Sequence, residues 1–323
     1  MIVLEYPIKL SPCFKDYLWG GDGLKRLFGK QSSMEVTAES WELSCHENGQ
    51  CTVAEGSHKG IKLIDFLRTD WEKYVGTNIK TENFPILVKF IDANKDLSIQ
   101  VHPSDDAADK SLGERGKAEM WYIVDCKPQS HIYYGFSKKI TRDEFIERAK
   151  NGTICEVLNR VDVQKGDIFY ILPGTVHALG AGIIAAEIQQ NSDTTFRIYD
   201  YKRLDKDGKP RPLHLERASE VVSYDPVVPH EMKINCQVFL KDFTFSKIFE
   251  SKYFKAFKLD VKTKAALRCD GTSFHYFLSV EGEGIIKHTG NTYYFGRGDS
   301  YFLPACLGEY EIHGECRLLL AHL

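Results

Sequence analysis

Short runs in which apolar and polar residues alternate follow one another along most of the chain. Clear examples lie at 97–102, 121–124, 168–172 and 276–280. Gly, Pro, Asn and Asp separate these runs at intervals of about 8–12 residues, a spacing typical of strands in a β-sandwich or barrel. The pattern therefore predicts a mainly β protein.

Periodicity of the helical kind is confined to a few segments. In 61–75, apolar residues recur at steps of three and four, which places them on one face of a helix. Thr141 followed by Glu144 matches a capping box, and Gly152 is a suitable helix end, so a second helix is predicted between them. The β body thus carries a modest helical insert. It is predicted to cover about 61–80 and 139–152, with shorter helices at 104–112 and 214–222.

A segment near residue 165 is repeated near residue 297. Both 165–173 and 297–304 begin with a basic residue, Gly and Asp, and continue as an apolar run that ends at Pro. Upstream, 119–124 can be laid on 273–278. Self-similarity over about one domain length indicates two related barrels in tandem.

Composition and charge exclude several classes of protein. Hydrophobic residues make up 43% and charged residues 27% of the chain, a balance that disordered proteins lack. The net charge of -3 provides no basic field for a polyanion, so we expect no nucleic-acid partner. A small anionic substrate is still allowed, because it needs only a local pair of cations.

Features of targeting and redox state point to the cytoplasm. The chain has no apolar run long enough to span a membrane and no signal-peptide pattern, so we expect no membrane partner. Its nine cysteines include no Cys-x-x-Cys pair, which argues against a thiolate zinc site and a disulfide framework. We therefore expect reduced cysteines and a cytoplasmic protein.

Three separate segments each offer side chains that could bind a metal. In the strand 98–103, Gln100 and His102 point to the same face. Glu119 opens an apolar strand, with Lys117 on the same face, and a Pro-Gly turn precedes His177. Each of these side chains alone is more often an ordinary surface or core residue. Together, two imidazoles, a carboxylate and an amide oxygen predict a site for a divalent metal such as Zn, Mn, Fe or Co.

The second copy of the repeat lacks these side chains. In the alignment above, Ser273 stands at the position of Glu119, and Gly308 at that of His177. A retained fold with lost ligands is typical of a structural partner barrel. We therefore expect a catalytic domain at 1–230 with the helical insert, a link near 225–235, and a degenerate, metal-free barrel at 231–323.

The segment 187–197 is dense in polar groups between apolar strands. Arg197 could clamp a phosphate or stabilise an oxyanion. The alternative is a surface loop in which Arg197 forms an ion pair with Asp193.

The motifs in this order resemble type I mannose-6-phosphate isomerase of the cupin superfamily, in its short bacterial form. The resemblance implies a cupin (double-stranded β-helix, or jelly-roll) fold with a small helical insert, and a zinc site that interconverts mannose 6-phosphate and fructose 6-phosphate. The motifs are Glu-Ser-Trp-Glu-Leu-Ser at 39–44, Gln-Val-His-Pro at 100–103, Lys-Ala-Glu-Met at 117–120, Pro-Gly-Thr-Val-His-Ala at 173–178 and Asn-Ser-Asp-x-x-x-Arg at 191–197.

The resemblance also implies a role for individual residues. The metal ligands are expected to be Gln100, His102, Glu119 and His177. The catalytic residues are expected to be Lys117, Glu187 and Arg197, and the substrate-binding residues Asp193, Lys202 and Arg203. The family often has a Lys six residues after its arginine, where this chain has Arg203 preceded by Lys202.

Several alternatives stay open on the sequence alone. Aldose–ketose isomerisation moves a proton through an enediol, and either Glu187 or Lys117 could be the base. A two-His-one-carboxylate iron oxygenase is disfavoured by Gln100 as a further ligand and by the Lys117 and Arg197 pair. An isomerase of another or unphosphorylated aldose, or a non-catalytic sugar-binding cupin, would keep the same barrel. The expected partner is a small phosphorylated sugar, and the expected state a monomer or weak dimer.

Overall fold

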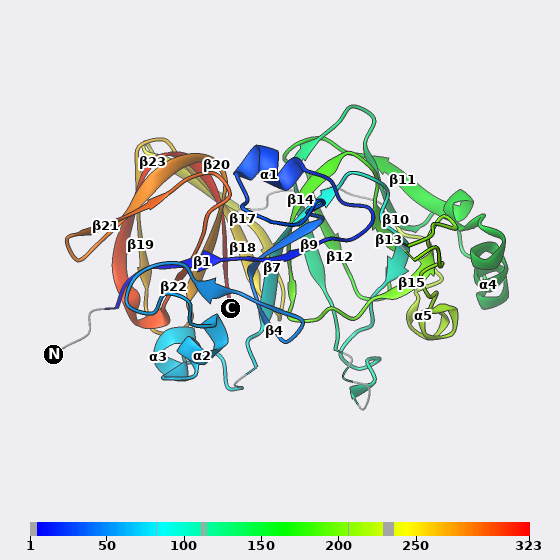
Figure 1. Cartoon of the computed structure of the whole chain (residues 1–323), viewed down its shortest axis with the longest axis horizontal. Coiled ribbons are helices and arrows are strands. Elements are labelled where there is room, and N and C mark those ends of the chain that lie inside the picture. Colours follow the sequence, from blue (N-terminus) through cyan, green and yellow to red (C-terminus); the bar gives the residue numbers. More distant parts are fainter. Residues whose placement is uncertain (1–4, 82, 111–112, 114, 206, 229–235) are drawn as a thin grey trace.

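Two barrel-like bodies of β-strands lie side by side in the computed structural model, which describes every residue except 1–4, 82, 111–112, 114, 206 and 229–235 (Figure 1). The middle of the chain, drawn in green, builds most of one body, and the C-terminal third, drawn in yellow to red, builds most of the other. The prediction of a mainly β protein is therefore confirmed.

The first body consists of two antiparallel sheets, whose strand order places residues from distant motifs next to one another. Its six-stranded sheet has the order β12 (Ile168–Ile171), β9 (Glu119–Cys126), β14 (Ile183–Gln190), β7 (Ile86–Ala93), β3 (Glu39–Leu43) and β2 (Cys13–Lys15). Its five-stranded sheet has the order β11 (Leu158–Asp162), β10 (His131–Phe136), β13 (His177–Leu179), β8 (Ile99–Val101) and β15 (Phe196–Tyr199). A small hairpin, β4 (Cys45–His46) and β5 (Gly49–Gln50), lies beside them.

The second body is a ten-stranded sheet that includes two strands from the N-terminal segment. Along its main path the order is β16 (Cys236–Phe239), β17 (Phe243–Glu250), β18 (Lys255–Val261), β23 (Gly308–His322), β20 (His275–His288), β22 (Ser300–Leu303), β1 (Ile8–Ser11) and β6 (Thr52–Val53). Off this path, β19 (Lys264–Cys269) pairs with β23, and β21 (Asn291–Phe295) pairs with β20. The N-terminal segment thus crosses to the C-terminal sheet. The division at residue 230 stays a prediction, and much of the expected link lies outside the described residues.

The helices are short and lie at the edges of the two bodies (Figure 1). The α-helices are α1 (Gly23–Phe28), α2 (Leu63–Leu67), α3 (Trp71–Val75), α4 (Arg142–Asn151) and α5 (Leu215–Val221). The 3-10 turns whose bounds are described are η2 (Ile154–Val157) and η3 (Ala305–Leu307). Within the described part of the chain, no helix is long and apolar enough to cross a bilayer.

Helices occur at three of the four predicted places, although the one at 61–75 is divided in two. For α4, the Thr141 side chain accepts a hydrogen bond from the backbone of Glu144, and Gly152 ends the helix with a left-handed φ of 79°. The helix at 214–222 is also present, as α5. The single helix at 61–75 is instead α2 and α3, because Asp70 caps a new helix by accepting from the backbone of Lys73.

At 104–112 no α-helix is found among the described residues: 105–107 form a turn, Lys110 is in a 3-10 conformation, and 111–112 lie outside the described residues. Here Asp105 does not stabilise a helical turn. Its carboxylate accepts hydrogen bonds from the backbone of Gly116 and the side chain of Gln190, so it ties two loops together.

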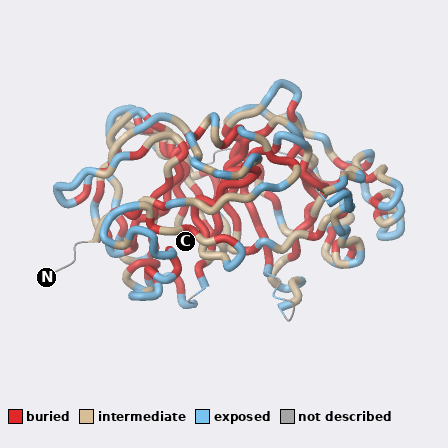
Figure 2. The backbone as a smooth tube through the Cα atoms, in the orientation of Figure 1, coloured by how far each residue is buried: buried red, intermediate tan, exposed pale blue. Residues whose placement is uncertain are grey.

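The six-stranded sheet is buried on both faces, which explains the continuous burial of β7 and β14 (Figure 2). Its outward face contributes Val88, Met120 and Ile188 to a large hydrophobic cluster that also contains Phe274 and Leu319 of the second body. The inward face carries Lys89, Trp121 and Glu187, at directly paired positions. Packing against the second body therefore holds rigid the strands that present polar groups inside the first.

The pairing registers of the two bodies correct the repeat alignment. In the first body Glu119 is opposite Ile171, and in the second His275 is opposite Leu303. Ile171 and Leu303 are equivalent in the repeat, so the counterpart of Glu119 is His275 and not Ser273. The position therefore carries an imidazole, which contacts the Tyr310 hydroxyl at 2.8 Å.

A buried ion pair connects the two bodies. Lys30 Nζ lies 2.6 Å from Glu42 Oε1, with side chains 9% and 1% exposed. The same ammonium donates to the carbonyl of Gly298, and the Ser300 hydroxyl donates to the carbonyl of Glu42. Burial raises the pKa of Glu42 despite the opposing effect of Lys30.

We expect Glu42→Leu to lower the free energy of unfolding by about 3–5 kcal/mol, because it leaves the Lys30 ammonium buried and unpaired. The double variant Lys30→Met with Glu42→Leu should recover most of this loss, since it removes both charges. Urea unfolding of the three proteins measures both effects. Equal stability of the single and double variants would contradict the prediction.

Candidate metal centre and substrate pocket

The side chains of His102, Glu119 and His177 converge inside the first body. One ligand atom from each lies within 4.8 Å of the other two. Glu119 and His177 are the first residues of β9 and β13, and His102 directly follows β8. Gln100 is paired with His177 across β8 and β13, and its side-chain amide lies 3.4 Å from His177 Nε2. The structure therefore brings together all four residues expected to be metal ligands.

Backbone carbonyls fix both imidazole rings. His102 Nδ1 lies 2.8 Å from the carbonyl of Thr194, and His177 Nδ1 lies 2.8 Å from that of Thr175. Nδ1 must carry the proton in order to donate to a carbonyl, so Nε2 keeps its lone pair. Both Nε2 atoms face Glu119, at 3.5 and 3.3 Å. This arrangement is typical of metal-binding histidines.

The protonation states also favour a cation. Burial, with Lys117 nearby, lowers the pKa of His102, and burial lowers the pKa of His177 to about 4, so both rings are neutral at pH 7. Burial and the neighbouring Glu187 raise the pKa of Glu119 to about 7. The Glu119 carboxylate is fully buried, and its charged neighbour on one side is the Lys117 ammonium, 2.7 Å away. Two imidazole lone pairs that converge on a buried carboxylate fit a divalent metal.

A chain of buried ion pairs extends from the metal ligands across the six-stranded sheet. Lys117 Nζ lies 2.7 Å from Glu119 and 3.7 Å from Glu187. Lys89 Nζ lies 3.2 Å from Glu187 and 3.3 Å from Glu39. Burial alone would raise the pKa of Glu187, but Lys89 and Lys117 lower it overall. Glu187 is therefore an ionised carboxylate beside the metal ligands.

Two tryptophans hold the carboxylates of this chain in place. Trp121 Nε1 donates to Glu187 at 2.7 Å, and Trp41 Nε1 donates to Glu39 at 2.7 Å. Glu39 and Lys89 were not predicted as site residues. The available signal for Lys89 was a Lys with two or more apolar residues on either side in β7, since a Lys buried on a central strand needs a partner.

The ion-paired groups and both tryptophans line a partly open pocket of about 180 Å³. Of the four expected metal ligands, Gln100 lines it as well. Arg197 is on its wall, with its Nη1 donating to the carbonyl of Pro212 and its buried Nε without a partner among the described residues. Asp193 also lines the pocket, where it pairs with His46 at 3.4 Å and accepts from Asn48. It does not pair with Arg197, so that alternative is wrong.

The structure places the basic residues after β15 differently from the expectation. Arg203 and Lys202 are not among the residues that line the pocket, whereas Arg211 is. Arg203 is bound instead to Asp200 and to the carbonyl of Asp96. Sequence reasoning missed Arg211 because 13 residues, the first two of them in β15, separate it from Arg197. Nothing in their pattern shows where the chain returns.

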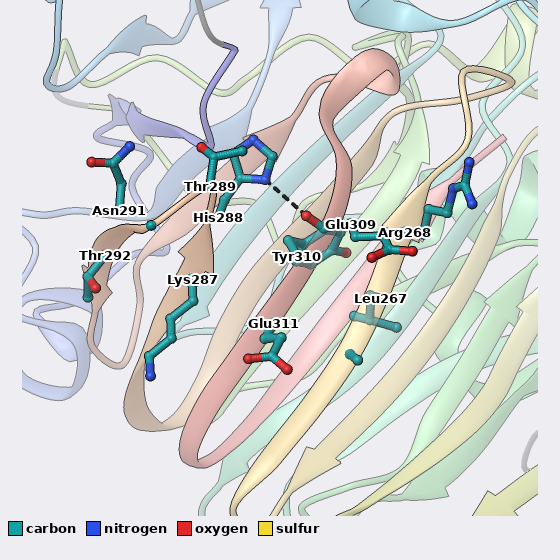
Figure 3. A pocket seen from close by; sticks show the side chains of 12 residues that line it. Leu267, Arg268, Lys287, His288, Thr289, Asn291, Thr292, Glu309, Tyr310 and Glu311 are labelled. Atoms are coloured by element: carbon teal, nitrogen blue, oxygen red, sulfur yellow. Dashed lines mark hydrogen bonds between the residues drawn. The ribbon is translucent and has the colours of Figure 1, made fainter.

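A larger hollow of about 790 Å³ lies on the second body, between β19, β20, β21 and β23 (Figure 3). Charged side chains of both signs, including Arg268, Lys287 and Glu311, surround it. His288 Nδ1 is bound to the carbonyl of Glu309 at 3.0 Å. Among the described residues, a group of three or more side chains suited to metal binding occurs only in the first body. The smaller pocket is therefore the candidate site.

Fold and site together define a cupin-type barrel with a candidate metal centre of two histidines and a glutamate. Comparison with known proteins agrees and is more specific. Residues 8–118 match the catalytic domain of type I phosphomannose isomerase, and residues 241–323 match the mannose-6-phosphate isomerase cupin domain. The mannose-6-phosphate isomerase ManA of Bacillus subtilis is 38% identical over 98% of this chain and 99% of its own length. The chain belongs to the type I mannose-6-phosphate isomerase family.

Solved structures support the fold. The crystal structure of the mannose 6-phosphate isomerase from Bacillus subtilis matches with a TM-score of 0.91 at 37% identity, and covers 99% of this chain and 100% of that one. A mannose 6-phosphate isomerase bound with zinc and yttrium has the same fold, with a TM-score of 0.78 at 16% identity over 98% of this chain and 99% of that one. The cupin fold expected from the sequence is confirmed.

Proposed function

We propose that this protein is a mannose-6-phosphate isomerase that interconverts mannose 6-phosphate and fructose 6-phosphate at a zinc centre. The observation that carries the proposal is a buried group of neutral His102, neutral His177 and Glu119. It lies beside a pocket that Gln100, the ionised Glu187 and two arginines line. Family membership over the whole chain gives the substrate class.

His102, Glu119 and His177, with the side-chain oxygen of Gln100, would hold the metal. Nitrogen and oxygen ligands of this kind suit zinc, and a solved relative by fold holds zinc. When bound, the cation supplies positive charge that polarises the sugar oxygens. Lys117, within 2.7 Å of Glu119, helps to orient that ligand.

Glu187 is the best candidate for the base that moves the proton between C1 and C2 of the sugar, and Lys117 is the second candidate. The Glu187 carboxylate lines the pocket, and its ion pairs keep it ionised and able to accept a proton. The Trp121 hydrogen bond fixes its direction. Lys89 and Lys117 are ammonium donors that can stabilise negative charge on the oxygens of the enediol.

Arg197 and Arg211 would bind the phosphate group at the pocket wall. Both are pocket-lining guanidinium groups, and burial with Arg211 nearby lowers the pKa of Arg197, as expected where cations gather to receive an anion. Asp193 would orient the sugar from the same wall. Arg203 contributes indirectly through Asp200, and Lys202 is adjacent to it.

A coupled assay tests the function directly. We expect turnover of mannose 6-phosphate that a chelator abolishes and added zinc restores. Turnover of free mannose but not of the phosphate would favour the other-aldose isomerase. Tight sugar binding without turnover in the zinc-loaded protein would indicate a non-catalytic cupin, and metal-dependent oxygen uptake an oxygenase.

The proposal extends to the location, the oligomeric state and the domain division of the protein. A soluble phosphorylated metabolite and nine cysteines without a disulfide are consistent with a cytoplasmic enzyme. We further propose a monomer or weak dimer, with a catalytic domain before about residue 230 and a structural barrel after it. Sedimentation at several protein concentrations would test the oligomeric state.

A further inference from the structure

A narrow hairpin leaves the pocket wall after β15 and returns with Arg211. The chain turns at Tyr201 and Lys202, which both have left-handed backbone angles, with φ of 54° and 56°. Leu204 then pairs with Pro210 in an antiparallel bridge. Arg211 follows this bridge and lines the pocket. The direction of its side chain therefore depends on what holds the base of the hairpin.

The carboxylate of Asp200 closes the base of this hairpin. It is only 4% exposed, and it accepts from Arg211 Nε at 2.8 Å and from Arg211 Nη2 at 2.7 Å. Arg203, on the outgoing arm, donates to the same carboxylate and to the carbonyl of Asp96. One buried carboxylate thus fixes both arms of the hairpin and ties them to a neighbouring loop.

The backbone beside the hairpin is bound to β15. His214 donates through its backbone to the carbonyl of Arg197 at 2.7 Å, and the Arg197 backbone donates to His214 Nδ1 at 3.0 Å. Backbone contacts therefore place the Cα of Arg211 near Arg197, but they do not orient its long side chain. The side chain of Arg211 is oriented by its two hydrogen bonds to Asp200.

We propose that Asp200 is a positioning residue that aims the Arg211 guanidinium at the phosphate of the substrate, and thereby sets the preference for phosphorylated over free sugar. The proposal rests on the function proposed above. Side-on pairing with Asp200 uses Nε and Nη2, so Nη1 is the part of this guanidinium without a partner among the described residues. Together with the unpartnered Nε of Arg197, it offers donors to a dianion.

A purely electrostatic view predicts the opposite effect of removing this carboxylate. Asp200→Asn makes the pocket wall more positive by one charge, so phosphate should bind more tightly if charge alone mattered. The positioning role predicts weaker binding, because an amide does not make two charge-assisted bonds to Arg211 and the guanidinium can turn away. The sign of the change separates the two views.

The test measures inorganic phosphate binding to the metal-loaded protein by calorimetry, and kcat and KM for mannose 6-phosphate and for mannose. For Asp200→Asn we expect the phosphate Kd and the KM for the phosphorylated sugar to rise by about tenfold to a hundredfold. The kcat at saturation and the kcat/KM for mannose should not change. Asp162→Asn is the matched control, because it removes the same charge from an exposed Asp–Arg pair with Arg160.

A double-mutant cycle with Arg211→Ala tests whether Asp200 acts through Arg211. If it does, adding Asp200→Asn to Arg211→Ala weakens phosphate binding no further. Should Asp200→Asn fail to fold, Asp200→Glu replaces it in the cycle, since it keeps the charge but displaces the guanidinium by one methylene.

Three results would overturn the proposal. The first is phosphate binding that is unchanged or tighter in Asp200→Asn. The second is a double variant in which the losses of phosphate affinity from Asp200→Asn and Arg211→Ala add. The third is a wild-type protein that does not bind phosphate. If the wild type binds phosphate but isomerises neither sugar, the proposed function fails, and the phosphate titrations still decide the role of Asp200 in an anion site.

Discussion

Replacing His102 with Ala should remove the bound metal and lower kcat/KM for mannose 6-phosphate by about 10³-fold or more. His102 supplies one of two imidazoles at the centre, and its Nε2 faces Glu119 at 3.5 Å. Loss of a Lewis acid that stabilises transition-state charge removes several kcal/mol, which corresponds to this loss of rate. Metal analysis of the purified variant, together with the coupled assay, measures both effects.

The fold should survive this substitution. The side chain lies in a buried site, so its removal costs a cavity of about 2–3 kcal/mol, less than a domain's usual stability. His131→Ala is the control, because that ring lies on β10 of the same body and contacts Arg160, away from the metal ligands. A His102→Ala protein with one zinc per chain and normal turnover would contradict the assignment.

The metal centre could be predicted because its residues follow local rules. The alternation of a strand fixes the shared face of Gln100 and His102, and the turn before His177 is visible as Pro-Gly. Alternation does not show that this polar face points inward, because Ile99 and Val101 on the opposite face are also buried, in a hydrophobic cluster. That orientation and the convergence of the ligands required the structure, because convergence depends on the pairing of β8 with β13 and on the approach of β9 from the other sheet.

The rest of the pocket depends on strand order, which alternation does not specify. Glu39, Lys89 and Glu187 meet because β3, β7 and β14 are neighbours in one sheet. Arg211 reaches the pocket through a hairpin whose return is fixed by Asp200. These contacts join segments far apart in sequence, so the local pattern of apolar and polar residues could not reveal them.

The misplaced repeat has a similar physical cause. Shifting one strand by two residues leaves every side chain on the same face, so the hydrophobic pattern is unchanged. The alignment with Ser273 therefore fitted the pattern as well as the correct one with His275. Only the hydrogen-bonded register to β22 distinguishes them.

Arg197→Lys should lower kcat/KM for mannose 6-phosphate by about 10²-fold, the scale of losing one oxyanion donor. A guanidinium can bind a phosphate or an oxyanion through two parallel bonds, whereas an ammonium provides a point charge. The buried Nε of Arg197, which has no partner among the described residues, is the donor that Lys cannot replace. Steady-state kinetics with both sugars measure the loss.

The same steady-state kinetics distinguish two roles of Arg197, phosphate binding in the ground state and stabilisation of the transition state. A rise confined to KM would place the interaction in ground-state phosphate binding, and equal losses in kcat and kcat/KM would place it in the transition state. The melting temperature should change little, because the side chain of Arg197 makes few contacts that stabilise the fold. Among the described residues, its side chain makes one hydrogen bond, to the carbonyl of Pro212. Arg160→Lys, at an exposed pair with Asp162, should leave the kinetics unchanged. Near-wild-type efficiency of Arg197→Lys would mean that the phosphate is held elsewhere, and Arg211 alone would then be the anchor.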